Sequence, residues 1–265
     1  MTLDVDRYLH RIGYAGAREP TSETLFALQR AHLLAVPFEA LDCHLGVPIR
    51  LETDALFEKI VVRRRGGFCY ELNGLFFELL VALAFRVRRL AARPFTADGA
   101  GRLAPPFAHL ALLVELERRW LTDVGFGFFS RAPLDVDLRS DQVVDGRRYR
   151  VVEEGSGLVA EDRGMASRWG YAFDLSGHEL DEFAGQCRIY STDPESGFVR
   201  RATVSRAFPD GWITVTRDRV LGGRAGERLD RPIADDADWR ATLRSLLDVE
   251  VPDPGAGGRR QGSGG

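Results

Sequence analysis

The stretch Arg63–Phe76, RRRGGFCYELNGLF, decides how the rest of the chain is read. It places one cysteine, Cys69, between a pair of glycines and an apolar segment with helical spacing. A thiol in the first turn of a helix is stabilised as a thiolate by the partial positive charge of the helix N-terminus. Gly66 and Gly67 permit positive φ and close backbone approach, as a tight turn before an exposed nucleophile requires. We therefore expect Cys69 to be a reactive thiol.

The neighbours of Cys69 supply further parts of a catalytic site. Arginine side chains just upstream add positive charge, and backbone N–H groups of the turn are suited to an oxyanion hole. We expect Arg65, Gly67 and Tyr70 to support the thiolate or the oxyanion. A thiolate also needs a base, and that base needs an orienting group.

His109 and Asp123 are the candidates for these two roles. His109 precedes an apolar strand in PPFAHLALLVEL, and Asp123 follows the next strand in RWLTDVGFG. If the two strands pair antiparallel through a turn near residues 117–118, residues whose numbers sum to about 235 oppose each other. We then expect His109 and Asp123 to lie at one end of a sheet, facing the helix of Cys69.

The hydrophobic pattern changes from helical to strand-like after Phe85. We expect helices within residues 3–13, 20–37 and 52–62 and from Cys69 onward. Two strands are expected within 107–126, and further strands at 147–154, 167–175, 198–208 and 212–221, with helices at 178–190 and 237–247. Helices followed by antiparallel strands and a smaller mixed segment indicate an α+β fold.

Composition excludes several classes of function. The net charge of −3 gives no basic footprint for nucleic acid. The N-terminal residues lack the apolar core of a secretory signal, and the longest apolar run, residues 75–85, is too short to cross a membrane. Three cysteines without a CxxC pair indicate neither a disulfide framework nor a metal site. We expect a cytoplasmic protein.

RRRGGFCYELNGLF, an isolated His109 and LTDVGFG occur in this order, and together they resemble the arylamine N-acetyltransferase family. Residues 8–16, 20–42 and 132–134 carry further landmarks of that family, and the resemblance fades beyond about residue 190. It implies a papain-like triad, with Cys69 as nucleophile, His109 as base and Asp123 as the group that orients the imidazole. The implied parts are a helical bundle (1–85), an antiparallel β-barrel (86–190) and an α/β lid (191–251), before a Gly-rich tail (252–265) that we expect to be disordered.

The resemblance also implies the reaction. An acyl thioester, acetyl-CoA, acylates Cys69, and an arylamine or hydrazine then attacks the enzyme thioester, without a bound cofactor. Two departures from the family pattern stand out: Ala40 replaces a common asparagine, and the DVGFG motif continues into two more phenylalanines. We expect Phe126, Phe128 and Phe129 to form an aromatic wall by the nucleophile, suited to an aromatic amine or a flat polyketide arene, with Phe38 as a further substrate contact. The alternative is that Phe126, Phe128 and Phe129 all belong to the barrel core.

Three alternatives stay open. An amide synthase of the same superfamily would use the same triad but take a polyketide from an acyl carrier protein and close a macrolactam on an arylamine of the same chain. A cysteine hydrolase or transglutaminase shares the Cys–His–Asp order, although the sequence around Cys69 and Asp123 argues against it. A non-catalytic interaction protein would need none of the three residues.

Overall fold

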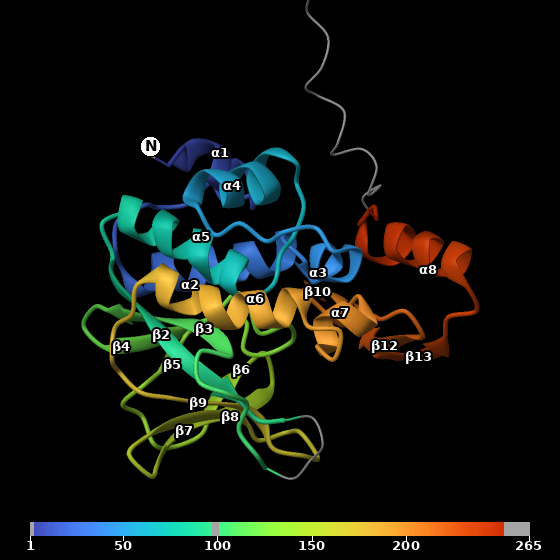
Figure 1. The fold of residues 1–265 in the computed structure, drawn as a ribbon. Coiled ribbons are helices and arrows are strands. Elements are labelled where there is room, and N and C mark those ends of the chain that lie inside the picture. The colour runs from blue at the N-terminus through green and yellow to red at the C-terminus, as the bar shows by residue number, and fades with distance from the viewer. Residues whose placement is uncertain (1–2, 97–100, 252–265) are drawn as a thin grey trace, which may run out of the picture.

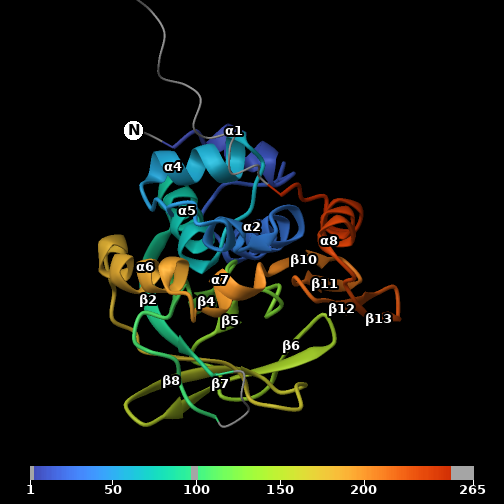
Figure 2. The same ribbon diagram turned by 45° about the vertical axis from the view of Figure 1, so that its right-hand side comes forward.

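The computed structural model describes residues 3–96 and 101–251, arranged as a helical layer, a β-barrel and a second, smaller sheet (Figure 1). The tail expected at 252–265 lies outside the described residues. The helical layer and the barrel meet along α5 and β3, while the smaller sheet lies beside both (Figure 2). Within the described part of the chain, no helix is long and apolar enough to cross a membrane, and a cytoplasmic location stays a prediction.

The helical layer forms where the sequence predicts helices. Its members are α1 (Val5–Arg11), α2 (Ser22–Ala35), α3 (Leu41–Leu45), α4 (Thr53–Phe57) with a π-helical turn (Glu58–Val62), and α5 (Cys69–Ala82). The side chain of Thr21 caps α2 by accepting from the N–H of Thr24. Most of α5 is buried, as expected for a helix that is apolar on nearly every side. The short helix α3 was not expected from the sequence.

The barrel is an antiparallel eight-stranded sheet. Its strand order is β5-β4-β3-β2-β9-β8-β7-β6, from β2 (Arg86–Pro94), β3 (His109–Glu115), β4 (Arg119–Thr122), β5 (Leu134–Asp135), β6 (Gln142–Val144), β7 (Arg147–Glu154), β8 (Gly157–Asp162) and β9 (Trp169–Phe173). The edge strands β5 and β6 are joined by the Gln142 side chain, which bonds the backbone N–H and C=O of Asp135 at 2.8 and 2.9 Å. The sheet is therefore nearly closed.

The smaller sheet is antiparallel, in the order β1-β10-β11-β12-β13. Its strands are β1 (Phe38–Glu39), β10 (Val204–Phe208), β11 (Gly211–Val215), β12 (Arg219–Arg224) and β13 (Glu227–Pro232). Because β1 comes from the helical region and pairs with β10, this sheet is anchored beside the RGG turn. The remaining helices are α6 (Ala184–Thr192), preceded by a 3-10 turn (Leu180–Phe183), α7 (Gly197–Arg201) and α8 (Asp236–Thr242), followed by a π-helical turn (Leu243–Leu247).

Two strand predictions in this region are wrong. Residues 198–208 were expected to form one strand, but Ser196 caps the short helix α7 by accepting from the N–H of Phe198. Ala202, with φ of 47°, then turns the chain into β10. Residues 212–221 form two strands rather than one, because a turn closed by the Thr216 hydroxyl and the Asp218 carboxylate separates β11 from β12.

Candidate active site

Cys69 is the first residue of α5 and only 3% exposed. The Glu71 carboxylate accepts a hydrogen bond from the N–H of Phe68 at 3.1 Å and so caps the helix directly before the thiol. The expected positive φ at Gly66 and Gly67 is wrong. The left-handed residue of the turn is Arg64, with φ of 56°. The close backbone approach that was also expected is confirmed at Gly66, since a Cβ there would lie 2.1 Å from the Pro37 carbonyl oxygen.

A buried ionic cluster surrounds this turn. The Lys59 ammonium contacts Glu71 at 2.7 Å and Asp42 at 2.8 Å. The Arg65 guanidinium binds Glu39 at 2.7 Å and Asp42 at 2.8 Å. Arg65 is thus committed to carboxylates of the helical layer, and any support that it gives to a Cys69 thiolate is indirect.

His109 and Asp123 meet as the strand pairing predicts. In the pairs of β3 with β4, such as Leu112 with Thr122, the residue numbers sum to 234 rather than to about 235, a shift of one residue. The ladder ends there, and the chain beyond β4 turns so that Asp123 Oδ2 lies 2.7 Å from His109 Nε2. Both side chains are buried, with residue exposures of 2% and 6%.

Asn73, one turn after Cys69 on α5, joins the helix to this pair. Its amide nitrogen donates to the Leu110 carbonyl at 2.7 Å and to Asp123 Oδ1 at 2.8 Å. Its amide oxygen accepts from the N–H of Val124 at 2.9 Å. Asn73 was not predicted from the sequence, although a lone asparagine in an apolar helix, four residues after the cysteine, is a readable signal of a buried polar role.

Gly125 completes the contact between the loop after β4 and the thiol. A Cβ at this position would lie 2.7 Å from Cys69 Cα and 2.8 Å from Asn73 Nδ2. Only glycine lets the loop pass this close to the start of α5. The Gln29 side chain supports the same loop, since it accepts from the N–H of Asp123 and donates to the Ser130 carbonyl. Gln29 was also missed, because nothing in the α2 pattern separates it from surface glutamine.

The electrostatics of the site differ from the simple expectation. Burial raises the pKa of the Cys69 thiol well above its ordinary value, and the backbone N–H groups of Leu110 and Tyr70 oppose this only in part. The helix N-terminus, expected to favour the thiolate, acts against this burial, and the reactivity of Cys69 stays a prediction. Burial also disfavours the Asp123 anion, but His109, Asn73 and the N–H of Gly125 outweigh burial and hold the pKa of Asp123 below its usual range.

The Tyr70 hydroxyl bonds the backbone before β3 rather than the Cys69 sulfur. It donates to the Phe107 carbonyl at 2.8 Å, so only the backbone N–H of Tyr70 favours the thiolate. Tyr171 brings a second buried hydroxyl close to the pair. Burial, followed by the nearby Asp123 charge, raises the pKa of Tyr171 well above its ordinary value.

The four phenylalanines expected to contact the substrate have different surroundings. Phe126 packs edge-on against the His109 ring, with 5.0 Å between ring centroids. Phe128 stacks between Trp212, at 4.0 Å, and Trp169, at 5.1 Å. Phe129 is buried in the barrel core. Phe38 lies on β1 beside Gly67 and faces Phe198 at 6.2 Å.

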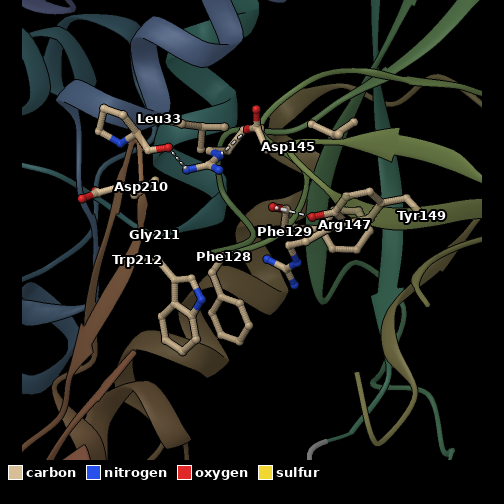
Figure 3. A pocket seen from close by; sticks show the side chains of 14 residues that line it. Leu33, Phe128, Phe129, Asp145, Arg147, Tyr149, Asp210, Gly211 and Trp212 are labelled. Atoms are coloured by element: carbon tan, nitrogen blue, oxygen red, sulfur yellow. Dashed lines mark hydrogen bonds and ion pairs between the residues drawn. The ribbon is translucent and has the colours of Figure 1, made fainter. Parts of the chain in front are cut away.

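A cavity of about 390 Å³ opens between the barrel and the smaller sheet. Figure 3 shows Phe128 and Trp212 side by side at its wall, with Arg147 next to Phe128. None of Cys69, His109 and Asp123 lines this cavity. The loop of residues 125–129 lies between, because Gly125 contacts Cys69 while Gly127, Phe128 and Phe129 line the cavity. Within 3–96 and 101–251, no cluster of His, Cys, Asp and Glu side chains is placed to hold a metal ion.

Comparison with known proteins gives consistent matches over nearly the whole chain. Residues 21–255 match a family model described as N-acetyltransferase. The chain is 35% identical over 240 residues to the arylamine N-acetyltransferase / N-hydroxyarylamine O-acetyltransferase of Salmonella typhimurium, covering 88% of this chain and 84% of that protein. It is 31% identical over 255 residues to proansamycin X synthase of Amycolatopsis mediterranei, covering 92% and 97%. The solved structure of Mycobacterium marinum arylamine N-acetyltransferase in complex with CoA is 32% identical, with a TM-score of 0.87 over 95% of this chain and 96% of that one.

Proposed function

Because the chain belongs to the arylamine N-acetyltransferase family of amide-forming acyltransferases, we propose that it transfers an acetyl group from acetyl-CoA to an aromatic amine or hydrazine through Cys69. The observation that carries the proposal is the 2.7 Å contact between His109 and Asp123, tied by Asn73 to the helix that begins at Cys69. The similar arylamine N-acetyltransferase of Mycobacterium marinum was solved in complex with CoA, which supports CoA as the carrier of the acyl group.

The proposed roles follow the papain-like order. Since burial makes an isolated Cys69 anion unfavourable, the thiol proton passes to His109, and the imidazolium is held by the buried Asp123 carboxylate. The thiolate then attacks the thioester carbonyl. The N–H groups near the start of α5 stabilise the tetrahedral oxyanion. When this intermediate collapses, the carbon–sulfur bond to CoA breaks, and the CoA thiolate takes the proton from His109.

The second half of the reaction reverses these steps with a different nucleophile. The amine attacks the acyl-Cys69 thioester, His109 accepts the amine proton, and the Cys69 thiolate leaves as the amide forms. We assign the acceptor ring to the side of His109 that Phe126 covers. Phe128, Phe129 and Phe38 stay candidates for further contacts with the substrate. The three-part division at residues 85 and 190, with 191–251 as a lid, belongs to the same proposal.

A second candidate is an amide synthase that releases a polyketide from a carrier-protein thioester onto an arylamine of the same chain. It is favoured by the match to proansamycin X synthase, which covers 97% of that protein. The aromatic stack of Phe128 and Trp212 at the 390 Å³ cavity would suit a flat polyketide arene.

One experiment separates these candidates. The intact mass is measured after acetyl-CoA is added without an acceptor, for wild type, for Cys69→Ala and for Cys187→Ala as a matched buried-cysteine control. One acetyl group on wild type and Cys187→Ala but not on Cys69→Ala, discharged by an aniline or hydrazine, is the expected result. Rapid alkylation of Cys69 without acetylation would favour the amide synthase over the acetyltransferase. Acetylation that persists in Cys69→Ala would remove Cys69 as the nucleophile.

A further inference from the structure

Phe107, two residues before His109, has an unusual backbone conformation. Its φ of 59° lies in the left-handed region, which bulky residues rarely occupy. Such a conformation persists only where the surroundings hold it in place. Because Phe107 leads directly into β3, the direction in which His109 enters the sheet depends on this turn.

Tyr70 supplies a side-chain hydrogen bond to this turn, which the backbone bond from the Ala108 N–H to the Pro105 carbonyl also closes at 3.3 Å. The Tyr70 hydroxyl donates to the Phe107 carbonyl at 2.8 Å. Tyr70 is fully buried, with its ring packed edge-on against Phe68 at 5.0 Å. The Phe107 ring in turn packs against Phe183 at 5.2 Å. The hydroxyl therefore has a fixed place from which to bond the carbonyl.

One helix, α5, thus donates hydrogen bonds to the backbone on both sides of His109. Tyr70 binds the carbonyl two residues before it, and Asn73 binds the carbonyl of Leu110, the residue after it, at 2.7 Å. Tyr70 and Asn73 are three residues apart, which brings their side chains to neighbouring positions on α5. Since Cys69 begins the same helix, these two bonds fix the histidine relative to the thiol.

We propose that Tyr70 is a positioning residue for acyl transfer, whose hydroxyl sets the approach of His109 to Cys69 by holding the left-handed turn at Phe107. The inference rests on the proposed function, because it matters only if Cys69 and His109 exchange a proton. In this proposal the Tyr70 hydroxyl holds the chain that leads into the strand of His109, and only the backbone N–H of Tyr70 bonds the Cys69 sulfur.

Tyr70→Phe tests the hydroxyl alone, because the ring and its packing remain. We measure the rate of Cys69 alkylation by iodoacetamide against pH, together with kcat and KM for acetyl-CoA and thermal unfolding. Tyr8→Phe is the matched control, since Tyr8 is equally buried and its hydroxyl bonds His32 at 2.9 Å in the helical layer. His109→Asn shows the alkylation profile without the histidine.

The expected result is specific to Tyr70. In Tyr70→Phe the alkylation profile moves to higher pH, toward that of His109→Asn, and kcat falls by roughly 10- to 100-fold, the scale of a small misplacement of a reacting group. KM changes little. Tyr8→Phe keeps the wild-type profile even where its unfolding temperature falls.

Two outcomes overturn the inference alone: Tyr70→Phe with the wild-type pH profile, or the same loss of activity in Tyr8→Phe. If wild type and His109→Asn alkylate with the same pH profile, the proposed Cys69–His109 pair itself is refuted, and the role of Tyr70 is refuted with it. The alkylation assay uses no acyl donor, so a wrong choice of donor affects neither reading.

Discussion

Gly125 brings the loop after β4 against the start of α5, and Gly125→Ala tests this contact. The added methyl group would lie 2.7 Å from Cys69 Cα and 2.8 Å from Asn73 Nδ2, whereas ordinary contact begins at 3.4 Å. Since Cys69 Cα is backbone, no side-chain rotation relieves the overlap. The loop and the start of α5 must move apart by about 0.7 Å.

Two effects of different size follow from this displacement. Overpacking of a buried contact costs about 1–3 kcal/mol of unfolding free energy. In a chain of 265 residues that lowers the unfolding temperature by about 2–6 °C. Because a shift near 1 Å between reacting groups can cost about 100-fold in rate, the acetylation of Cys69 is expected to slow by about that factor. Activity therefore suffers more than stability.

The assay is the first-order rate of Cys69 acetylation, followed by intact mass, with thermal unfolding of the same samples. Gly46→Ala is the control, because Gly46 ends α3 with φ of 68° and an added Cβ meets nothing within 4 Å. Its left-handed strain costs about 1–2 kcal/mol, a similar loss of stability away from the thiol. Wild-type acetylation in Gly125→Ala, or an equal slowing in Gly46→Ala, would refute the reasoning.

Two further predictions concern charge and ring stacking. Burial opposes ionisation of Asp42, but Lys59 and Arg65 outweigh it and hold the pKa of Asp42 below 3.8. The stabilisation from this lowered pKa is complete above about pH 4 and is lost as the pH falls through the folded-state value. In urea titrations, unfolding free energy should therefore fall more steeply below about pH 4 for wild type than for Asp42→Asn, and parallel curves would contradict this. Phe128→Ala removes the ring between Trp212 and Trp169. Its kcat/KM for an aromatic amine should fall about 2- to 10-fold relative to a small aliphatic hydrazine, the range of one aromatic contact, and an unchanged ratio would exclude Phe128 from the acceptor site.

The helical layer and the central strands could be predicted because their signals are local. Apolar spacing and a threonine cap mark α2, and β7 falls on the predicted residues 147–154. The errors at residues 198–208 and 212–221 arose where capping overrode strand propensity, since Ser196 and Asp218 each bond a nearby group and interrupt an otherwise suitable run. Strand β8 (Gly157–Asp162) was missed because one glycine and two acidic residues lower the strand propensity of a segment in which every residue pairs with β7.

The family and its acyl-transfer activity were predicted correctly because RGG-Phe-Cys and DVGFG are continuous motifs, and the comparisons confirm them. For the two strands beside His109 and Asp123, the predicted register was within one residue of the observed one, because one short turn fixes how the strands align. The partners of Arg65 and the surroundings of Phe129 depend on which segments meet in space. Glu39 and Asp42 lie more than twenty residues before Arg65, and no local pattern links them. The roles of all these side chains stay predictions.

The first five residues of α5 explain why the motif around Cys69 is continuous in the sequence. Three of their side chains contact different parts of the molecule: Tyr70 binds the chain entering β3, Glu71 binds Lys59 in the helical layer, and Asn73 binds the loop after β4. The Asn73 bond is buried and the other two are partly buried, so the loss of any of them costs folding free energy. The sequence motif is continuous because these neighbouring residues contact the helical layer, the chain entering β3 and the loop after β4. The thiol at the start of α5 is therefore oriented by the same contacts that assemble the fold, and substitutions that remove one hydroxyl or add one methyl group are the means to separate chemistry from stability.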